Sequence, residues 1–568
     1  MNDRFPFWTR ANVGEVLPEP PSPLGWDLVW ETGTLEGWRH CYVERLGMGP
    51  DELSPGRPEV TGMFGGYAYL GATATRIWAE RTPGMDAGMI DAAYYGDHPD
   101  VPPYVAEPWH HRPETTTHME GWLGWVMGSF DQSELQADRV TADAARASRP
   151  DLTAASDADL IARARSFAPT IKDMFSQHIN QSGAASIGPG TLGAIATAMG
   201  DPTLTLRLIG GLGDVDSAAP SYAMWELSRT VRSSATLRDA FGNGHQGLTA
   251  WLRTSDDPDV RAFVADLDAF LAEFGSRGPN EWDIHSDVWE TKPDLVLALV
   301  DRMRLAPDDA APGTSHAARE AEREALVSSV NEALAGDPET QGLFNAAITS
   351  AKTFVPGRER SKTSIIKVIH EVRMAVFELG RRAVAAGALA HPADICLLFD
   401  DELEAFMADP TSFADTIAER QAHLEHLKSI EPPFIINETV PPIDTWPQRA
   451  DHGFSPLAVG EVLAGLPGCS GTYRGTARVI LDPSEPGDLD HGDVLIAPHT
   501  DPAWTPLFVA AGAVVVNVGA ALSHAIIVSR ELGLPCVVSA TDATMRIPDG
   551  AEIEVNGDTG AVTVVSLP

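Results

Sequence analysis

One stretch decides the fold of the C-terminal part of this chain: Ala513-Val-Val-Val-Asn-Val-Gly-Ala-Ala-Leu-Ser-His-Ala-Ile-Ile-Val-Ser-Arg-Glu-Leu-Gly-Leu-Pro-Cys536. The β-branched run at 513–516 predicts a buried strand, and Val518-Gly519-Ala520 predicts a tight turn. Residues 523–532 then predict a helix, which is followed by a second strand from Cys536. The pattern is strand, turn, helix and strand.

The ends of the predicted helix are marked by residues that favour helix termini. Ser523 is a natural N-cap, because a serine side chain accepts a hydrogen bond from a first-turn N–H. Gly533 is a natural residue after the helix and Pro535 a natural stop. His524 is therefore predicted in the first turn, just beyond the end of a strand.

Further short β-branched runs flank this stretch and are separated by turn residues, which is typical of a compact β-rich α/β domain. These runs are Gly475–Ile480, Asp493–Ala497, Cys536–Ser539 and Glu552–Val555. Upstream, apolar residues recur near the helical period, as in Leu160, Ile161, Ala164, Phe167 and Ile171, and again from Ile365 to Leu379. The sequence therefore predicts an α+β multidomain protein.

Prolines separate the two parts. Glu431-Pro-Pro-Phe and Val440-Pro-Pro-Ile-Asp-Thr-Trp-Pro can neither continue a helix nor form a central strand. As an extended linker this segment would reach on the order of 50 Å. The alternative, for the first half of the segment, is a proline-rich strap packed on the helical domain. We predict a mostly helical domain at 1–430, a linker at 431–450 and the β-rich domain at 451–568.

Composition excludes several classes of protein. The formal net charge is -39, whereas nucleic-acid and anionic-membrane binding depend on Lys and Arg that neutralise phosphates. The four cysteines are far apart and lack metal-ligand spacing, so they predict reduced thiols and no metal site. The N-terminus has no apolar signal segment, and the longest apolar run, 506–522, is too short and interrupted to span a membrane. We therefore expect a cytoplasmic protein.

His524 has a chemical role available to it. Exposed N–H groups and the positive end of the helix dipole attract an anionic phosphoryl group. A neutral imidazole nitrogen is a nucleophile that can hold and release that group covalently. The alternative is a histidine that only caps or packs.

The stretch from Leu522 to Cys536 resembles the signature of the phosphohistidine swivelling domain of PEP-utilising enzymes, and Thr500-Asp-Pro-Ala-Trp-Thr-Pro-Leu-Phe508 resembles the segment that precedes it. The resemblance implies a β/β/α swivelling fold for 451–568, with His524 as phosphocarrier and Ser523 as support for the carrier helix. Leu522 stands where many members have Thr.

The resemblance extends upstream. Trp8–Pro18, Phe274-Gly-Ser-Arg-Gly-Pro-Asn-Glu-Trp-Asp-Ile284 with Trp289, and Arg358-Glu-Arg-Ser-Lys362 resemble the acceptor-binding region of rifamycin phosphotransferases and related dikinases. This implies that the helical domain binds the acceptor, and that Arg358 and Lys362 flank its hydroxyl.

Charged and aromatic residues in these motifs have structural alternatives. Arg358 and Lys362 are at i and i+4 near the start of the predicted helical block, so their side chains share one face of the helix. The alternative to a catalytic role is a solvated face on which they pair with Glu359 and other acidic residues. Arg277 and Glu281 have the same spacing, which fits an intrahelical ion pair or a substrate site. Trp282, with Phe274 and Trp289, is a candidate for an aromatic acceptor pocket or for core packing.

The sequence contains no P-loop, whereas full-length relatives of this kind begin with an ATP-grasp domain. We therefore expect a separately encoded ATP-grasp partner that binds ATP and Mg²⁺, with no cofactor tightly bound to this chain. The arrangement resembles the two-component aryl-phosphate synthases, which implies relay of the ATP β-phosphoryl through phosphorylated His524 to a phenol such as 4-cresol or another small alcohol. The alternatives are a rifamycin-type phosphotransferase with a split donor subunit and a non-catalytic phosphocarrier or regulatory protein.

Overall fold

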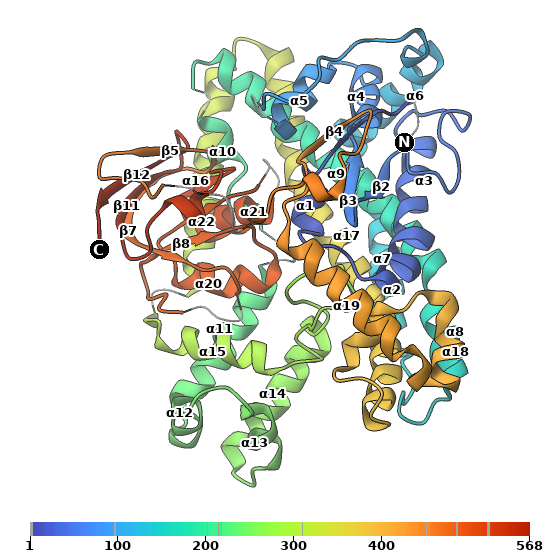
Figure 1. Ribbon diagram of the computed structural model, residues 1–568. Coiled ribbons are helices and arrows are strands. Elements are labelled where there is room, and N and C mark those ends of the chain that lie inside the picture. The colour runs from blue at the N-terminus through green and yellow to red at the C-terminus, as the bar shows by residue number, and fades with distance from the viewer. Residues whose placement is uncertain are drawn as a thin grey trace. The chain divides into compact units, whose positions relative to one another are not determined.

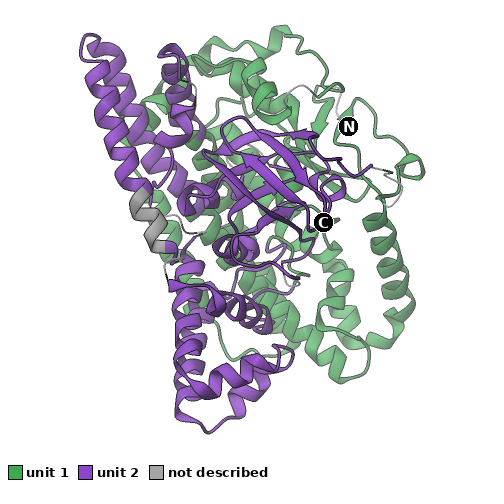
Figure 2. Cartoon of the chain, turned by 90° about the vertical axis from the view of Figure 1, so that its left-hand side faces the viewer, with its two compact units in different colours: residues 1–185, 282–286, 360–453 green, residues 186–281, 287–359, 454–568 purple. Residues whose placement is uncertain are grey.

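The computed structural model describes residues 4–95, 98–201, 203–213, 216, 218–308, 311–449, 453, 455–483, 487–519 and 523–568, and only the backbone of 313–318. The chain forms two compact units, each built from three segments (Figure 2). Unit 1 comprises Met1–Ala185, Trp282–Ser286 and Arg360–Gly453. Unit 2 comprises Ser186–Glu281, Asp287–Glu359 and Phe454–Pro568.

Unit 2 contains an eight-stranded sheet in the order β5-β12-β11-β7-β8-β9-β10-β6 (Figure 1). Strands β7 to β10 are parallel neighbours, and the remaining pairs are antiparallel. The strands are β5 Val462–Ala464, β6 Leu466–Cys469, β7 Thr472–Val479, β8 Val494–Ala497, β9 Ala513–Val516, β10 Cys536–Val538, β11 Glu552–Asn556 and β12 Ala561–Ser566. The predicted β-rich α/β domain is confirmed.

Both faces of the central strand β9 are buried. Val514 and Val516 belong to one apolar core, whereas Ala513 and Val515 belong to another on the opposite face. This alternation follows from the two-residue period of a strand, and it explains why the run is continuously apolar. Helices α20 (Thr505–Ala510) and α21 (His524–Leu532) contribute to the first core.

The first core continues into the helical part of unit 2. Val296 and Val300 of helix α15 belong to it, as do Trp504 and Phe508 of the β-rich domain. The helices of this part are α10 Leu204–Leu208, α11 Ala219–Ser233, α12 Ala235–Gly242, α13 Leu248–Thr254, α14 Pro258–Phe274, α15 Asp294–Leu305 and α16 Pro312–Ala333, with α22 Ala543–Arg546 in the β-rich domain. The β-rich domain therefore packs an apolar face against helices in this structure.

Unit 1 is mainly helical and carries a four-stranded sheet in the order β2-β3-β1-β4. The strands are β1 Phe7–Thr9, β2 Thr61–Phe64, β3 Tyr67–Gly71 and β4 Ile435–Asn437. The main helices are α1 Val13–Val16, α2 Pro23–Gly25, η1 Trp26–Leu35, α3 Glu36–Glu44, α4 Ala72–Arg81, α5 Ala87–Tyr95, α6 Pro113–Gly124, η3 Trp125–Ser129, α7 Ser133–Ala147, α8 Asp157–Ser166, α18 Leu403–Ala408 and α19 Ala414–Ser429. The predicted fold class, helical first and β-rich last, is confirmed.

The proline-rich segment is a strap rather than an extended chain over its described residues. Strand β4 pairs antiparallel with β1, and the N–H of Glu431 donates to the carbonyl of Pro447 at 2.8 Å. Trp446 is buried against Tyr67. The strap, expected as an alternative only for the first half of the segment, fits residues 431–448, because the prolines leave enough N–H groups for one short edge strand. The division at 430 and 450 stays a prediction, and residues 450–452 lie outside the described residues.

Two long helices run through both units. Helix α9 (Ala168–Ala198) contains Pro189, and helix α17 (Pro338–Ala385) contains Pro356. Each proline lies within four residues of a unit boundary, at 185/186 and 359/360, and a proline removes one backbone hydrogen bond of the helix. The prediction that Arg358 and Lys362 are near a helix start is wrong. They are in the middle of α17, because Pro356 interrupts the hydrogen-bond ladder without ending the helix. Among the described helices, none is both long and apolar enough to cross a membrane.

Candidate functional site

The carrier candidate His524 is the first residue of helix α21, as predicted. The N-cap residue Ser523 has extended backbone angles, and Gly533 ends the helix in the left-handed conformation at φ 73°. The Ser523 side chain makes no capping hydrogen bond, and its buried hydroxyl has no partner among the described residues. Ser523 therefore occupies the cap position without satisfying a first-turn N–H. Ala520 and Leu522 lie outside the described residues.

Two threonine hydroxyls hold the His524 ring. Nδ1 lies 3.1 Å from Oγ1 of Thr500, and Nε2 lies 3.1 Å from Oγ1 of Thr505. The edge of the ring faces Phe508, with ring centroids 6.1 Å apart, and only 8% of the residue is exposed. A neutral imidazole has one N–H and one lone pair, so one hydroxyl accepts and the other donates. The two hydroxyls therefore fix the orientation of the ring.

Asp501 shapes the loop that supplies these threonines. One carboxylate oxygen accepts from the N–H of Ala503 at 2.9 Å, which caps a short 3-10 helix (Pro502–Trp504) before α20 begins. The other oxygen accepts from the N–H of Asn280, also at 2.9 Å. Asn280 lies in the predicted acceptor motif 274–284 and has a left-handed φ of 47°. Within unit 2, the structure thus joins this motif to the loop that cradles the carrier.

Arg277 and Glu281 form the predicted ion pair, with Nε and Oε2 2.8 Å apart, but not on a helix. Helix α14 ends at Phe274, and both residues lie in the turns that follow. Gly278 in this loop has φ 158°, and a Cβ there would meet Val288 at 2.8 Å, so the chain must leave the helical path. Both side chains are almost fully buried, so removing either would leave a buried charge.

Arg358 and Lys362 are both half-buried residues of helix α17, so neither is on a freely solvated face. Arg358 Nη1 pairs with Glu359 Oε1 at 2.7 Å within unit 2. Lys362 belongs to unit 1. Arg373, farther along α17, is fully buried and donates to the backbone carbonyl of Asp283 at 3.1 Å. The catalytic roles of Arg358 and Lys362 stay predictions.

Trp282 lies in an aromatic cluster in unit 1 that also contains Trp30, Phe175 and His178, with ring centroids about 6 Å apart. The Nδ1 atom of His178 is 2.9 Å from the hydroxyl of Ser361, the residue before Lys362. Sequence reasoning missed His178 and Phe175, because their helical spacing alone fits ordinary core residues. By contrast, Phe274 and Trp289 pack against Phe270 in the core of unit 2, as the packing alternative predicted.

No group of His, Cys, Asp and Glu side chains in the described part of the chain is arranged to hold a metal ion. The four cysteines are free and buried. Burial raises the pKa of the Cys469 thiol to about 11 and that of Cys536 to about 12. Both thiols therefore stay protonated near neutral pH and are poor nucleophiles.

Comparisons with known proteins match two segments of the chain, which lie mainly in unit 2. Residues 177–359 match the rifampicin phosphotransferase fourth domain, and residues 489–560 match the mobile domain of PEP-utilising enzymes. The second match contains His524 and both threonines that contact it.

Several curated proteins are similar over about half of the chain. A rifampicin phosphotransferase of Streptomyces sviceus is 31% identical over 308 residues, which cover 53% of this chain and 34% of that protein. An uncharacterized protein of Mycobacterium tuberculosis is 32% identical over 302 residues, covering 53% and 31%. The prodigiosin synthesizing transferase PigC of Serratia marcescens is 30% identical over 369 residues, covering 63% and 40%. The chain thus covers from about a third to about two fifths of the length of these relatives. Over the matched segments the chain is similar to rifampicin phosphotransferases and to the mobile domain of PEP-utilising enzymes.

Proposed function

We propose that the protein transfers a phosphoryl group through phosphorylated His524 to the hydroxyl of a phenolic acceptor. The observation that carries this proposal is the neutral cradle of His524 at the start of helix α21, inside a match to a mobile domain. Enzymes with this domain generally use a phosphohistidine intermediate. Each ring nitrogen of His524 contacts a threonine hydroxyl, and a hydroxyl can either donate or accept as the ring gains and loses a phosphoryl group.

Two features of unit 1 support an aromatic acceptor. Trp30 and Trp282 are buried, with exposed fractions of 1% and 3%, and their indole N–H groups have no partner among the described residues. A buried N–H without a partner costs about 1 to 3 kcal/mol, which a phenolic oxygen would recover. The aromatic rings around them suit a flat ligand. Lys362, next to the Ser361 that contacts His178, would stabilise the developing phenolate.

The proposed transfer balances in two steps. In the first, a separate ATP-binding subunit with Mg²⁺ supplies the β-phosphoryl of ATP to a His524 nitrogen, and ATP with water yields AMP and phosphate. In the second, the P–N bond of phosphohistidine breaks, a P–O bond to the phenol forms, and the phenolic proton goes to the histidine. The product is an aryl phosphate.

The second step can be tested with this chain alone. The purified protein would be phosphorylated with potassium phosphoramidate, freed of reagent, and mixed with phenol, 4-cresol, benzyl alcohol or rifampicin. We expect stoichiometric aryl phosphate from 4-cresol by mass spectrometry, and none from a His524→Ala variant. Loss of the label only as free phosphate with every acceptor would contradict the proposal.

Rifampicin belongs in this panel because several similar proteins are rifampicin phosphotransferases. Phosphorylation of rifampicin but not of the phenols would favour the antibiotic as acceptor and reject a cresol-like one.

The first step is tested by calorimetry with Mg-ATP. Absence of binding heat is expected if the nucleotide site is on a separate subunit. One-to-one binding with a micromolar Kd would reject the proposed partner while leaving the carrier role of His524 intact.

A further inference from the structure

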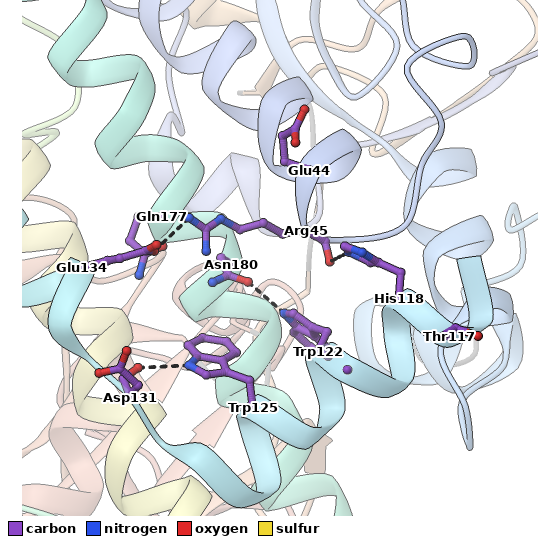
Figure 3. Close-up of a pocket in the computed structure, with 11 residues that line it drawn as sticks. Glu44, Arg45, Thr117, His118, Trp122, Trp125, Asp131, Glu134, Gln177 and Asn180 are labelled. Atoms are coloured by element: carbon purple, nitrogen blue, oxygen red, sulfur yellow. Dashed lines mark hydrogen bonds and ion pairs between the residues drawn. The ribbon is translucent and has the colours of Figure 1, made fainter. Parts of the chain in front are cut away.

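Unit 1 contains a cleft of about 550 Å³ that is separate from the residues proposed to handle the phosphoryl group. It lies between helices α3, α6, α7 and α9 and the turn of helix η3 (Figure 3). Its volume suits a ligand of one or two rings. The lining includes neither His524 nor Lys362. A ligand here would therefore be additional to the proposed acceptor.

Two tryptophans one helical turn apart give the cleft its aromatic surface. The indole N–H of Trp122 donates to Oδ1 of Asn180 at 2.8 Å, and that of Trp125 donates to the backbone carbonyl of Asp131 at 3.1 Å (Figure 3). These hydrogen bonds hold both indoles in place. Because their N–H groups already have partners, the rings offer a ligand mainly apolar surface and electron-rich faces.

The charged side chains of the lining are predominantly acidic. Glu44, Asp131 and Glu134 line the cleft together with Arg45, whose Nη2 is paired with Glu134 Oε2 at 2.8 Å. Next to them, burial raises the pKa of Asp138 to about 6, with further contributions from Glu134 and Asp173. A cluster of carboxylates beside indole faces attracts cations and repels anions.

Gln177 adds a specific polar group. The residue lines the cleft, only 5% of it is exposed, and its side-chain oxygen Oε1 has no hydrogen-bond partner among the described residues. Helix α9 places it one turn before Asn180, the residue that anchors Trp122. A buried amide oxygen without a partner is unfavourable, so a ligand that donates an N–H would be stabilised there.

We propose that this cleft binds a small aromatic ammonium ion. The ring packs against Trp122 and Trp125, the ammonium donates to Oε1 of Gln177, and the excess of carboxylates over cations balances its charge. Each feature selects against a different competitor: the indoles against small inorganic cations, the carboxylates against aromatic acids and phosphates, and the amide oxygen against ligands without a donor.

The test uses three probes with one benzene ring and different charge: benzylammonium, benzyl alcohol and benzoate. Calorimetry on the full chain should give a Kd for benzylammonium about tenfold or more below that of benzyl alcohol, and no binding of benzoate. Equal affinities for the three probes, or no binding of benzylammonium at millimolar concentration, would overturn the proposal.

Variants locate the binding. Gln177→Leu keeps the side-chain size and removes the acceptor, and Asp131→Asn removes one charge from an exposed position. Each should weaken benzylammonium about fivefold to tenfold. Asp131→Asn should leave benzyl alcohol nearly unchanged, whereas Gln177→Leu should weaken it less than benzylammonium, because its neutral hydroxyl can donate to the same oxygen. Trp125→Leu should weaken both probes, whereas Trp251→Leu, at an exposed tryptophan of α13 in unit 2, should change neither. If Gln177→Leu does not fold, Asp131→Asn and Trp125→Leu still test whether benzylammonium binds in this cleft. Unchanged affinity in both would place binding elsewhere and reject the site.

Discussion

His524 of unit 2, the proposed carrier, and the buried Glu371 of helix α17 in unit 1 are held by different kinds of partner. His524 contacts two neutral hydroxyls at 3.1 Å. Glu371, which is fully buried, instead contacts Nη2 of Arg149 at 2.6 Å and Nη2 of Arg163 at 2.8 Å. Both side chains have hydrogen-bonding partners, but the partners differ in how well they tolerate a change of charge on the side chain.

A hydroxyl both donates and accepts, so it can follow a change in protonation or phosphorylation of its partner. A buried carboxylate between two guanidinium groups cannot lose a partner without leaving a charge in a poor solvent. The chain has 41 Lys and Arg residues against 80 Asp and Glu residues, so ion pairs of this kind occupy cations that a phosphoryl site would need. The threonine contacts of His524 can therefore adjust to a change in the ring, as the proposed exchange requires, whereas the ion pairs of Glu371 hold α17 in the fold.

Replacement of the carrier should have the largest effect. His524→Ala is expected to lose all acid-labile, base-stable phosphate after treatment with the phosphoryl donor, because no other group replaces the nucleophilic nitrogen. The variant should fold, since the ring contacts two threonine hydroxyls and one aromatic edge. The measurement is radiolabel on the protein after acid and base treatment, with His426→Ala, an exposed histidine of α19, as control. Label retained by His524→Ala would place the carrier elsewhere.

Removal of the buried carboxylate of Glu371 should have the second largest effect, a loss of stability. Glu371→Leu leaves Arg149 and Arg163 without their shared carboxylate and should cost about 3 kcal/mol. The first thermal transition should fall by on the order of 5 °C or more, measured by calorimetry. Glu425→Leu, whose carboxylate pairs with Lys428 on the surface of α19, is the matched control and should change little. Equal small shifts would show that the buried cluster is dispensable.

The carrier region was predictable because its signals are local. The strand, helix, cap position and left-handed Gly533 all lie within one stretch of the sequence, and each follows from a short-range rule. Thr500 and Thr505 lie in the segment that the resemblance singled out, but their contact with His524 depends on how two loops meet. Periodicity does not encode that distance.

The acceptor region was harder to predict because its contacts join distant segments. The spacing of Arg277 and Glu281 suggested a helix, yet the pair forms in a loop whose path is set by Gly278 and by packing on Val288. Trp282 meets His178 from another part of the chain, which no local pattern reveals. The apolar pattern also indicated a helix start near residue 358, although α17 begins twenty residues earlier, at Pro338.

Lys362→Ala tests whether the side chain of Lys362 on α17 takes part in phosphoryl transfer to the acceptor. If Lys362 stabilises charge on the acceptor, transfer from phosphorylated protein to 4-cresol should slow about a hundredfold, while phosphorylation of His524 is unchanged. Rapid-quench measurement of aryl phosphate gives the rate. Lys428→Ala, on the surface of α19, is the control. An unchanged rate would contradict a role of Lys362 in the transfer and would indicate that it is a structural residue, as Glu371 is.

Substitution of the two threonines that contact His524 should have the smallest effects on the rate, and these effects can show which ring nitrogen is phosphorylated. Thr500→Val and Thr505→Val each remove one hydroxyl from a ring nitrogen at nearly constant volume. A hydrogen bond of this kind contributes about 1 kcal/mol, so each change should slow phosphorylation by about fivefold. The two effects should differ, because the nitrogen that attacks gives up its threonine while the opposite nitrogen keeps its N–H bonded throughout.

The larger loss therefore identifies the threonine opposite the attacking nitrogen. If Thr500→Val is the slower variant, Nε2 attacks, and if Thr505→Val is slower, Nδ1 attacks. NMR of the phosphorylated imidazole distinguishes the two isomers independently and must agree with the rates. Wild-type rates in both variants would mean that the hydroxyls only fill space, and the proposed contrast between exchangeable contacts at His524 and fixed ion pairs at Glu371 would then fail.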